Sequence, residues 1–499
     1  MSRRYGNRPR SPRPFAMDCR DIYLMGICGT GMAGLAGLLR QKGYNVRGSD
    51  SQAYPPMSEL LKGLRIPVQL GYGEENLSTM PDLVIIGNVI RRDNPEAVYV
   101  LREKIPYMSF PQALSHFFLC ERTPLVVAGT HGKTTTSSLL VSALAGTGED
   151  PGFMIGGVLN AYDSGFHLGN PPWFVLEGDE YDTAFFDKQP KFIYYMPKAA
   201  ILTSIEFDHA DIYQDLDAVK AAFVRFVEII PQDGLIVACA DWPAVRDVLR
   251  YARCRVVTYG ESKDLDYYFK SYRTDDIGTE FDFKTQNGTQ LHAAIRLPGR
   301  HNALNALGVA ALLMELGFNP QEVLHGLSLC PGVKRRQEVR GIEAGVTVID
   351  DFAHHPTAVK ETLRALKEKY RDRRIIAVFE PRTNTSRRAV FQHAYPEAFL
   401  DADMVMVREV PDPEKAPPGD RFSSKRLVED LRALKIDAAL FPDAKAIVEA
   451  LLPLCRKGDV VAVLSNGAFE DIHDRLLGAL KNKDLLCKSC ATILDGGAH

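Results

Sequence analysis

The hydrophobic pattern of the chain changes abruptly at Asp18, where a stretch rich in Arg and Pro gives way to regular elements. Residues 21–27 form an apolar run typical of a buried strand, and residues 29–43 place apolar side chains at helical spacing after a glycine-rich opening. Residues 44–50 form a second strand that ends in Asp50. A strand, a helix and a strand in this order predict a βαβ unit.

The same kind of pattern continues along the chain. A buried strand is expected at 83–88, and prolines at 106 and 111 break the chain before the next helical stretch. We therefore expect a first α/β domain over residues 18–121, preceded by a disordered leader at 1–17.

A second alternation of strands and helices begins at Pro124. Apolar strands at 173–182, 199–209 and 234–241 each run into polar residues, as in parallel sheets whose strand ends carry chemistry. Between 259 and 295, apolar and polar residues alternate around glycine turns, which predicts antiparallel hairpins, and a clear helix follows at 301–317. We expect this central domain to cover residues 122–331.

A third alternation follows the boundary near Pro331. Its strands are expected at 346–351, 374–381, 404–409 and 459–467, with a charged amphipathic helix at 357–370 and an exposed Pro-rich loop at 411–420. This domain is expected at 332–480, with a tail at 481–499. The fold class is thus α/β in three domains, the central one with a parallel sheet and a small antiparallel sheet.

Composition narrows the function classes. The 60 Lys and Arg nearly balance the 63 Asp and Glu, which argues against a nucleic-acid partner held by phosphate contacts. No apolar run approaches the roughly 20 residues of a membrane helix, and no apolar segment follows the basic N-terminus as in a secretory signal. The 9 scattered cysteines fit a reducing cytoplasm. Cys487 and Cys490 form a CxxC pair with no second ligand pair nearby, so we expect no zinc there.

The strongest chemical signal is the segment GTHGKTT at 129–135, between an apolar strand and a helix. Backbone N–H groups of such a loop hold phosphate oxygens, while Lys133 neutralises outer phosphates and Thr134 can coordinate magnesium. Only two residues separate Gly129 from Gly132, which departs from the usual spacing. We predict nucleotide binding, with Lys133 as an exposed loop side chain.

Two further residues lie at the same sheet edge. Glu177 ends the strand WFVLE, where phosphate-binding domains keep an acid for a metal, and His209 follows the strand ILTSI. Either could instead be a solvated loop residue. Their shared edge with the phosphate loop favours a role in phosphoryl transfer.

A second glycine-rich loop stands in the first domain, with Gly26, Gly29 and Gly31 followed by Asp50. Glycines there allow close approach to a pyrophosphate, and the acid can bind a ribose. The spacing is GxxGxG and not GxGxxG, so a dinucleotide and another pyrophosphate ligand such as a UDP-sugar both remain open. Asp50 and Asn88 are candidates for the uridine side, or simple caps of the following turns.

Taken together, the segments GTHGKTTT, EGDEYD, IEFDH, HNALN, KRR and DDFAHHPTA, in this order, resemble the Mur ligases. The resemblance covers about residues 18–480 and implies Rossmann-like first and third domains around a central ATPase domain. It implies that ATP and Mg²⁺ are bound, and it assigns roles to individual residues. Phosphates would contact Gly129, Thr130, His131, Gly132, Lys133, Thr134 and Thr135. Magnesium would contact Thr134, Glu177 and His209.

The remaining nucleotide contacts come from later segments. The resemblance implies that Asn302 and Asn305 face the adenine, that Arg336 reaches the γ-phosphate, and that Asp351 and His354 contact the nucleoside. Lys133, Glu177, His209 and Arg336 would form the catalytic group. The peptide would bind along the third domain at Arg382, Asn384 and Ser465, whose alternative role is ordinary loop structure. The third domain should close about the boundary near Pro331 when nucleotide binds.

Within the family, segments such as EYDTAFFDK, EPRTNT and SNGAFEDIH are most similar to members that join UDP-N-acetylmuramate to the tripeptide L-Ala-γ-D-Glu-meso-diaminopimelate in peptidoglycan recycling. The resemblance implies an acyl phosphate, with release of ADP and phosphate. A ligase that adds one L-alanine to the same sugar nucleotide is the alternative. A regulatory nucleotide-binding module or a Rossmann oxidoreductase would be of a different class. No counterpart of the family's carbamylated lysine stands out among Lys188, Lys191 and Lys198.

Overall fold

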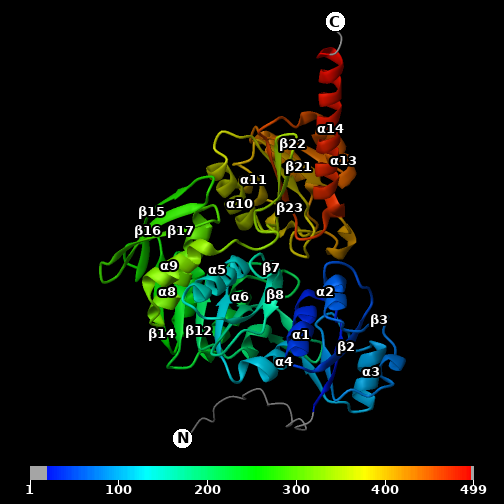
Figure 1. The fold of residues 1–499 in the computed structure, drawn as a ribbon, viewed down its shortest axis with the longest axis vertical. Coiled ribbons are helices and arrows are strands. Elements are labelled where there is room, and N and C mark those ends of the chain that lie inside the picture. Colours follow the sequence, from blue (N-terminus) through cyan, green and yellow to red (C-terminus); the bar gives the residue numbers. More distant parts are fainter. Residues whose placement is uncertain (1–18, 496–499) are drawn as a thin grey trace.

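The protein is described by a computed structural model, which covers residues 19–495 and, in the last helix, side chains as far as residue 483. The predicted leader lies outside the described residues, as do the side chains of Cys487 and Cys490. Figure 1 shows a central part in cyan and green that borders both the blue N-terminal part and the yellow-to-red C-terminal part. The predicted α/β fold in three domains is confirmed.

The first part is a five-stranded parallel sheet in the order β3-β2-β1-β4-β5 within the described residues. It contains the predicted βαβ unit, because the apolar side chains of β1 and the glycine-opened α1 are buried against each other. The strands are β1 (Asp21–Met25), β2 (Asn45–Asp50), β3 (Val68–Leu70), β4 (Leu83–Ile86) and β5 (Tyr107–Ser109), and the helices are α1 (Thr30–Gln41), α2 (Met57–Gly63), α3 (Pro95–Arg102) and α4 (Phe110–Leu114).

The first and central parts meet at a glycine-bearing face of α1. A Cβ atom at Gly34 would lie 2.6 Å from Cε of Met154, and one at Gly37 would lie 2.2 Å from Cζ of Phe166. Met154 and Phe166 belong to strands β7 and β8 of the central sheet. The absence of side chains on this face of α1 therefore allows the two parts to pack closely.

The central part is a ten-stranded sheet in the order β17-β16-β15-β14-β13-β12-β6-β9-β7-β8 within the described residues, with a separate hairpin β10-β11. Its strands are β6 (Thr123–Ala128), β7 (Gly152–Leu159), β8 (Ser164–His167), β9 (Trp173–Gly178), β10 (Asp182–Ala184), β11 (Asp187–Pro190), β12 (Ala199–Leu202), β13 (Leu235–Cys239), β14 (Arg255–Gly260), β15 (Tyr267–Thr274), β16 (Thr279–Thr285) and β17 (Gln290–Ile295). The helices are α5 (Lys133–Gly146), α6 (Leu216–Ile229), α7 (Pro243–Leu249), α8 (Arg300–Glu315) and α9 (Pro320–Leu329).

Helices cover both faces of the parallel strands in this sheet. Leu125 and Val127 of β6 pack in the cluster with α5, α8 and α9, whereas Val126 and Ala128 pack in the cluster with α6 and α7. Burial on both faces explains the continuous apolar runs in the sequence. It also leaves the carboxyl ends of β6, β9 and β12 side by side, because these strands are parallel.

The predicted antiparallel hairpins are β15, β16 and β17, although residues 255–260 at their start form β14, which runs parallel to β13. The hairpin pairing of β7 with β8 was not predicted. Its short second strand carries Gly165 and His167, which gave no clear apolar pattern.

The third part is a six-stranded sheet in the order β18-β19-β23-β20-β21-β22 within the described residues, parallel except for the edge strand β18. The strands are β18 (Glu338–Glu343), β19 (Val346–Asp351), β20 (Ile375–Phe379), β21 (Met404–Arg408), β22 (Asp437–Phe441) and β23 (Val460–Leu464). The helices are α10 (Pro356–Lys369), α11 (Tyr395–Ala398), α12 (Ser424–Ala433), α13 (Ala444–Leu454) and α14 (Ile472–Asp495). In Figure 1, α14 extends away from the rest of the chain. Across the part of the chain that is described, none of the helices has both the length and the apolar character needed to span a bilayer.

Candidate active site

The phosphate loop joins β6 to α5 and depends on two glycines. Gly129 has a φ of +134°, and a Cβ there would lie 2.2 Å from Oγ1 of Thr203. Gly132 has a φ of +79° and lies against the side chain of Asn305. The loop is tied to the end of β12, since the N–H of His131 donates to Oγ of Ser204 over 2.9 Å. Left-handed backbone and close approach therefore require glycine at both positions.

Lys133 is buried, which corrects the prediction of an exposed side chain. Its side chain is 12% exposed, and Nζ donates to the carbonyl of Gly129 over 2.7 Å and to Glu180 over 3.1 Å. His209 lies on the other side of the same carboxylate, with Nε2 3.3 Å from Oε1 of Glu180. Lys133, Glu180 and His209 thus form one ionic group at the carboxyl ends of β6, β9 and β12.

The charges of this group support one another. Burial alone would raise the pKa of Glu180, but Lys133 and His209 hold it at about 2. Burial disfavours the charged form of Lys133, yet the carboxylates of Glu180, Asp179 and Glu177 together outweigh this effect and raise the lysine pKa. The pKa of His209 is raised in the same way, against the effect of burial. The carboxylate of Glu180 is therefore held in its ionised form between Lys133 and the ring of His209.

Glu177 has a different environment. Its Oε2 accepts a hydrogen bond from Oγ1 of Thr134 over 3.2 Å, and its Oε1 accepts one from the N–H of Gly156 over 2.8 Å. Burial and the neighbouring charge of Asp179 raise the pKa of this carboxyl. A buried carboxylate with a raised pKa beside a hydroxyl is a suitable place for an added cation. Arg336 of the third part reaches the same point, with Nη2 3.4 Å from Oγ1 of Thr134.

A cavity of about 390 Å³ opens beside the loop, and its described lining includes the residues expected to bind nucleotide except Gly129, Thr130 and His354. The central part contributes the loop from His131 to Thr135 and, from α8, Asn302 and Asn305. The third part contributes Arg336 and Asp351. Both carboxylate oxygens of Asp351 accept backbone N–H groups, from Gln337 over 2.8 Å and Ala353 over 2.7 Å. The wall that Asp351 forms is therefore rigidly held.

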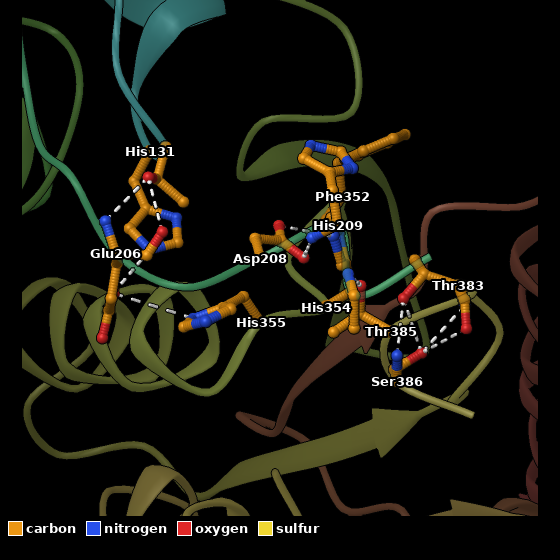
Figure 2. Close-up of polar contacts among 12 residues, drawn as sticks. His131, Glu206, Asp208, His209, Phe352, His354, His355, Thr383, Thr385 and Ser386 are labelled. Carbon is orange, nitrogen blue, oxygen red and sulfur yellow. Dashed lines mark hydrogen bonds and ion pairs between the residues drawn. The ribbon is translucent and has the colours of Figure 1, made fainter. Parts of the chain in front are cut away.

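His354 lies outside the described lining of this cavity, in the contact between the central and third parts (Figure 2). Its Nε2 is 4.0 Å from Oδ2 of Asp208, the residue before His209. Burial would raise the pKa of Asp208, but His209 and then His354 outweigh it and lower that pKa. Close by, a second contact joins the two parts, because the N–H of Ala210 donates to Oγ1 of Thr385 over 3.2 Å.

The glycine-rich loop of the first part is held by the acid that follows it. The N–H of Cys28 donates to Oδ2 of Asp50 over 2.8 Å, and the N–H of Gly26 donates to the carbonyl of Ser49 over 2.8 Å. Gly29 caps α1, and a Cβ at Gly31 would lie 3.5 Å from the ring of Phe110. Asn88 is exposed in the turn after β4. Asp50 therefore orders the loop, and ligand contacts of these five residues stay predictions.

The three residues expected to contact the peptide lie near the carboxyl ends of β20 and β23. The guanidinium of Arg382 packs so closely on Gly467 that a Cβ there would lie 1.8 Å from Nη1. The hydroxyl of Ser465 is buried and donates to Glu380 over 2.5 Å. Asn384 donates to Asp211 of the central part over 2.9 Å. Arg382 and Asn384 are both exposed, but Asn384 is already bonded to Asp211, so Arg382 is better placed to meet a ligand.

Sequence reasoning missed the acids Glu180, Glu206 and Asp208. All three directly follow the buried strands β9 and β12, within the segments EGDEYD and IEFDH. Each of these segments carries several acids, and nothing local shows which of them will face Lys133 or a histidine. The clustering of acids after two neighbouring strands was the available signal.

Comparison with known families accounts for this arrangement. The family profiles described as Mur ligase family, catalytic domain, as Mur ligase middle domain, and as Mur ligase, glutamate ligase domain match residues 21–120, 127–313 and 335–467, respectively. The chain belongs to the Mur ligase family. Mur ligases are ATP-dependent ligases that form amide bonds, and this chain is therefore an enzyme of that kind.

Several relatives are similar over nearly the whole Mur ligase chain. The UDP-N-acetylmuramate–L-alanyl-γ-D-glutamyl-meso-2,6-diaminoheptandioate ligase of Escherichia coli strain K12 is 39% identical over 93% of this chain and 98% of its own. The crystal structure of a murein peptide ligase from Psychrobacter arcticus 273-4 is 33% identical, with a TM-score of 0.69 over 92% of this chain and 98% of its own. The crystal structure of a UDP-N-acetylmuramate–alanine ligase from Thermotoga maritima is 25% identical, with a TM-score of 0.75 over 93% of this chain and 99% of its own.

Proposed function

We propose that this Mur ligase joins UDP-N-acetylmuramate to the tripeptide L-Ala-γ-D-Glu-meso-diaminopimelate, with conversion of ATP to ADP and phosphate. The observation that carries the proposal is that Lys133 of the central part and Arg336 of the third part line the same cavity beside the phosphate loop. The name of the Escherichia coli relative, at 39% identity over 93% of the chain, supports the choice of tripeptide.

A free carboxylate does not react with an amine, because its oxygen is a poor leaving group. The carboxylate must therefore be phosphorylated first. An oxygen of the sugar's carboxylate attacks the γ-phosphorus, the bond to the β-phosphate oxygen breaks, and ADP leaves. The amine of the peptide then attacks the acyl phosphate, and phosphate departs with the oxygen that came from the carboxylate. Lys133 and Arg336 neutralise the anions that must approach one another, and the loop orients them.

We also propose a magnesium ion at Thr134, Glu177 and His209. The hydroxyl and carboxylate oxygens of Thr134 and Glu177 are hard donors of the kind that Mg²⁺ prefers, and an added cation would offset the burial and the charge of Asp179 that raise the pKa of Glu177. The bound ion would neutralise phosphate charge. His209 is the least typical donor of the three, and Glu180 holds its ring in place.

The substrate side of the proposal uses the predicted residues. The UDP-sugar would bind at Gly26, Gly29, Gly31, Asp50 and Asn88 of residues 18–121, and the peptide at Arg382, Asn384 and Ser465 of residues 332–480. Support comes from the ordered glycine loop and from the exposed guanidinium of Arg382 near the end of β20. A recycling enzyme of this kind would work in the cytoplasm, where its nucleotide substrates are made.

Competition between acceptors tests the choice of substrate. Purified protein is given UDP-N-acetylmuramate, ATP and magnesium with equal concentrations of the tripeptide and L-alanine, and the products are separated by mass. We expect the tripeptide product to dominate. Dominance of the alanine product would establish the second candidate, a UDP-N-acetylmuramate–L-alanine ligase. That candidate is favoured by the higher TM-score of the Thermotoga maritima structure, 0.75 against 0.69.

A further inference from the structure

The carboxylate of Glu206 lies where the phosphate loop meets the third part of the chain. From the loop, Nε2 of His131 lies 2.7 Å from Oε2 of Glu206. From the first turn of α10, the hydroxyl of Thr357 reaches both carboxylate oxygens, at 2.9 and 2.8 Å. One acid thus joins the nucleotide-binding loop to the domain that closes on it.

The backbone of Glu206 is fixed to the same loop. Its N–H donates to Oγ1 of Thr130 over 2.9 Å, and that hydroxyl donates to the carbonyl of Glu206 over 3.1 Å. The loop and residue 206 therefore move as one unit. The hydrogen bonds from the Thr357 hydroxyl are among the contacts with this unit that docking of the third part makes or breaks.

His355 completes the contact from the third part. Its ring centroid is 4.6 Å from that of His131, and Figure 2 shows both rings turned toward Glu206. Nδ1 of His355 accepts the N–H of Thr357 over 3.2 Å, so Nε2 carries the proton and donates to the carbonyl of Phe207 over 3.2 Å. These bonds fix the first turn of α10, and with it the position of the Thr357 hydroxyl.

Glu206 acts on the nucleotide site only through its neighbours. His131 and Thr357 line the ATP cavity, whereas Glu206 is outside its described lining. A hydrogen bond to an ionised carboxylate is stronger than one between neutral groups. Loss of the Thr357 hydroxyl would leave the carboxylate free to turn, and His131 would lose its fixed partner.

We propose that Glu206 is a positioning residue that makes the order of the phosphate loop depend on docking of the third domain. With Thr357 in place, the carboxylate is held in the one orientation that fixes the ring of His131 beside the phosphates. Without it, the loop binds nucleotide less tightly. The inference rests on ATP binding at this cavity, which the proposed function also requires.

The same side chains have donor atoms that a metal could use. Among the described residues, His131, Glu206 and His355 form a group whose ligand atoms all lie within 4.8 Å of one another. Both ring nitrogens of His355 already have hydrogen-bond partners, however, and the hydroxyl of Thr357 already donates to the carboxylate of Glu206. The contacts therefore favour a hydrogen-bonded link over a metal site.

A double-mutant cycle tests the link, with affinity for a non-hydrolysable ATP analogue as the readout. Thr357→Val keeps the shape and the backbone N–H but removes the hydroxyl. We expect it to weaken analogue binding by about tenfold, the loss typical of one hydrogen bond to a charged group. Glu206→Gln should weaken binding to a similar extent. The double variant should bind like either single variant, because both changes remove the same link.

The controls separate this role from direct contact and from general docking. Thr357→Ser, which keeps the hydroxyl, should restore binding. Tyr272→Phe removes another hydroxyl-to-carboxylate bond between the same two parts, to Glu368 at 3.1 Å, but far from the loop, and should change affinity by less than about twofold. Additive losses in the double variant would show that Thr357 contacts nucleotide directly and would overturn the proposal.

Two further outcomes would also overturn it. One is unchanged analogue affinity in Thr357→Val, with the loss confined to thermal stability. The other is Zn²⁺ binding by the wild-type protein that is lost in Glu206→Gln, which would assign the group to a metal. Analogue binding needs no peptide or sugar, so the wild-type protein gives a result here even if the proposed ligation fails.

Discussion

At the scale of single residues, Lys133 contributes both to the proposed nucleotide site and to the stability of the fold around it. Its ammonium faces the cavity for nucleotide, and it also neutralises Glu180, whose side chain is 2% exposed. A buried acid that loses one of its cationic partners is costly. Lys133 is therefore part of what holds the end of β9 to the phosphate loop.

Lys133→Ala should consequently affect both activity and stability. We expect turnover to fall at least about 100-fold, since a cation at the transferred phosphate is lost. We expect the free energy of unfolding to fall by about 3 kcal/mol, because among the described residues His209 is then the ion-pair partner left to Glu180. Steady-state kinetics and urea unfolding measure the two effects. Lys188→Ala, which removes an exposed lysine paired with Asp182, should change neither quantity. Near-normal turnover in Lys133→Ala would remove this residue from the mechanism.

Glu177 should show the opposite balance between stability and activity. Burial and Asp179 raise the pKa of its carboxyl, so removing its charge relieves repulsion instead of creating it. Glu177→Gln should keep or raise the melting temperature while the magnesium concentration needed for half-maximal rate rises about tenfold or more. Titration of the rate with MgCl₂ measures this shift, with UDP-sugar affinity as the control. An unchanged magnesium requirement would place the metal elsewhere.

At the scale of elements, what could be predicted depended on how local the signal was. The strand, glycine loop and helix around residues 123–146 are contiguous, so their pattern revealed both the structure and the phosphate site. The hairpins β7-β8 and β18-β19 also join neighbouring segments, but β8 and β18 are short or largely exposed strands and gave no clear apolar pattern. Glu180 escaped notice for a different reason, since it meets Lys133 from 47 residues away. The resemblance to Mur ligases supplied the third-domain residues Arg336 and Asp351, which no local pattern would have brought to the loop.

Helix α1 offers a test of how the first part is fixed to the central one. Gly37→Ala would place a Cβ 2.2 Å from the ring of Phe166, so we expect a loss of about 1–3 kcal/mol in the free energy of unfolding. Gly63→Ala in α2 is the matched control, because a Cβ there meets nothing within 4 Å. Urea unfolding should show that control to be neutral or slightly stabilised. A neutral Gly37→Ala would mean that α1 is not closely packed on β7 and β8.

At the scale of the whole molecule, the cavity proposed to bind ATP is lined by two parts of the chain. Lys133 and Asn302 come from the central part, and Arg336 and Asp351 from the third. A ligand that contacts both parts favours the arrangement in which they meet. Solution scattering should therefore show a smaller radius of gyration when an ATP analogue and UDP-N-acetylmuramate are added together. Identical scattering curves with and without these ligands would argue against closure about the segment near Pro331.

The most direct test of the whole account follows the oxygen atoms of one reaction. UDP-N-acetylmuramate labelled with ¹⁸O in its carboxylate is incubated with the protein, ATP, magnesium and the tripeptide, and all products are analysed by mass spectrometry. We predict UDP-N-acetylmuramoyl-tripeptide, unlabelled ADP, and phosphate that carries one ¹⁸O per molecule, because the acyl phosphate transfers a carboxylate oxygen to phosphorus. Label in AMP, or unlabelled phosphate alongside the amide product, would contradict the mechanism.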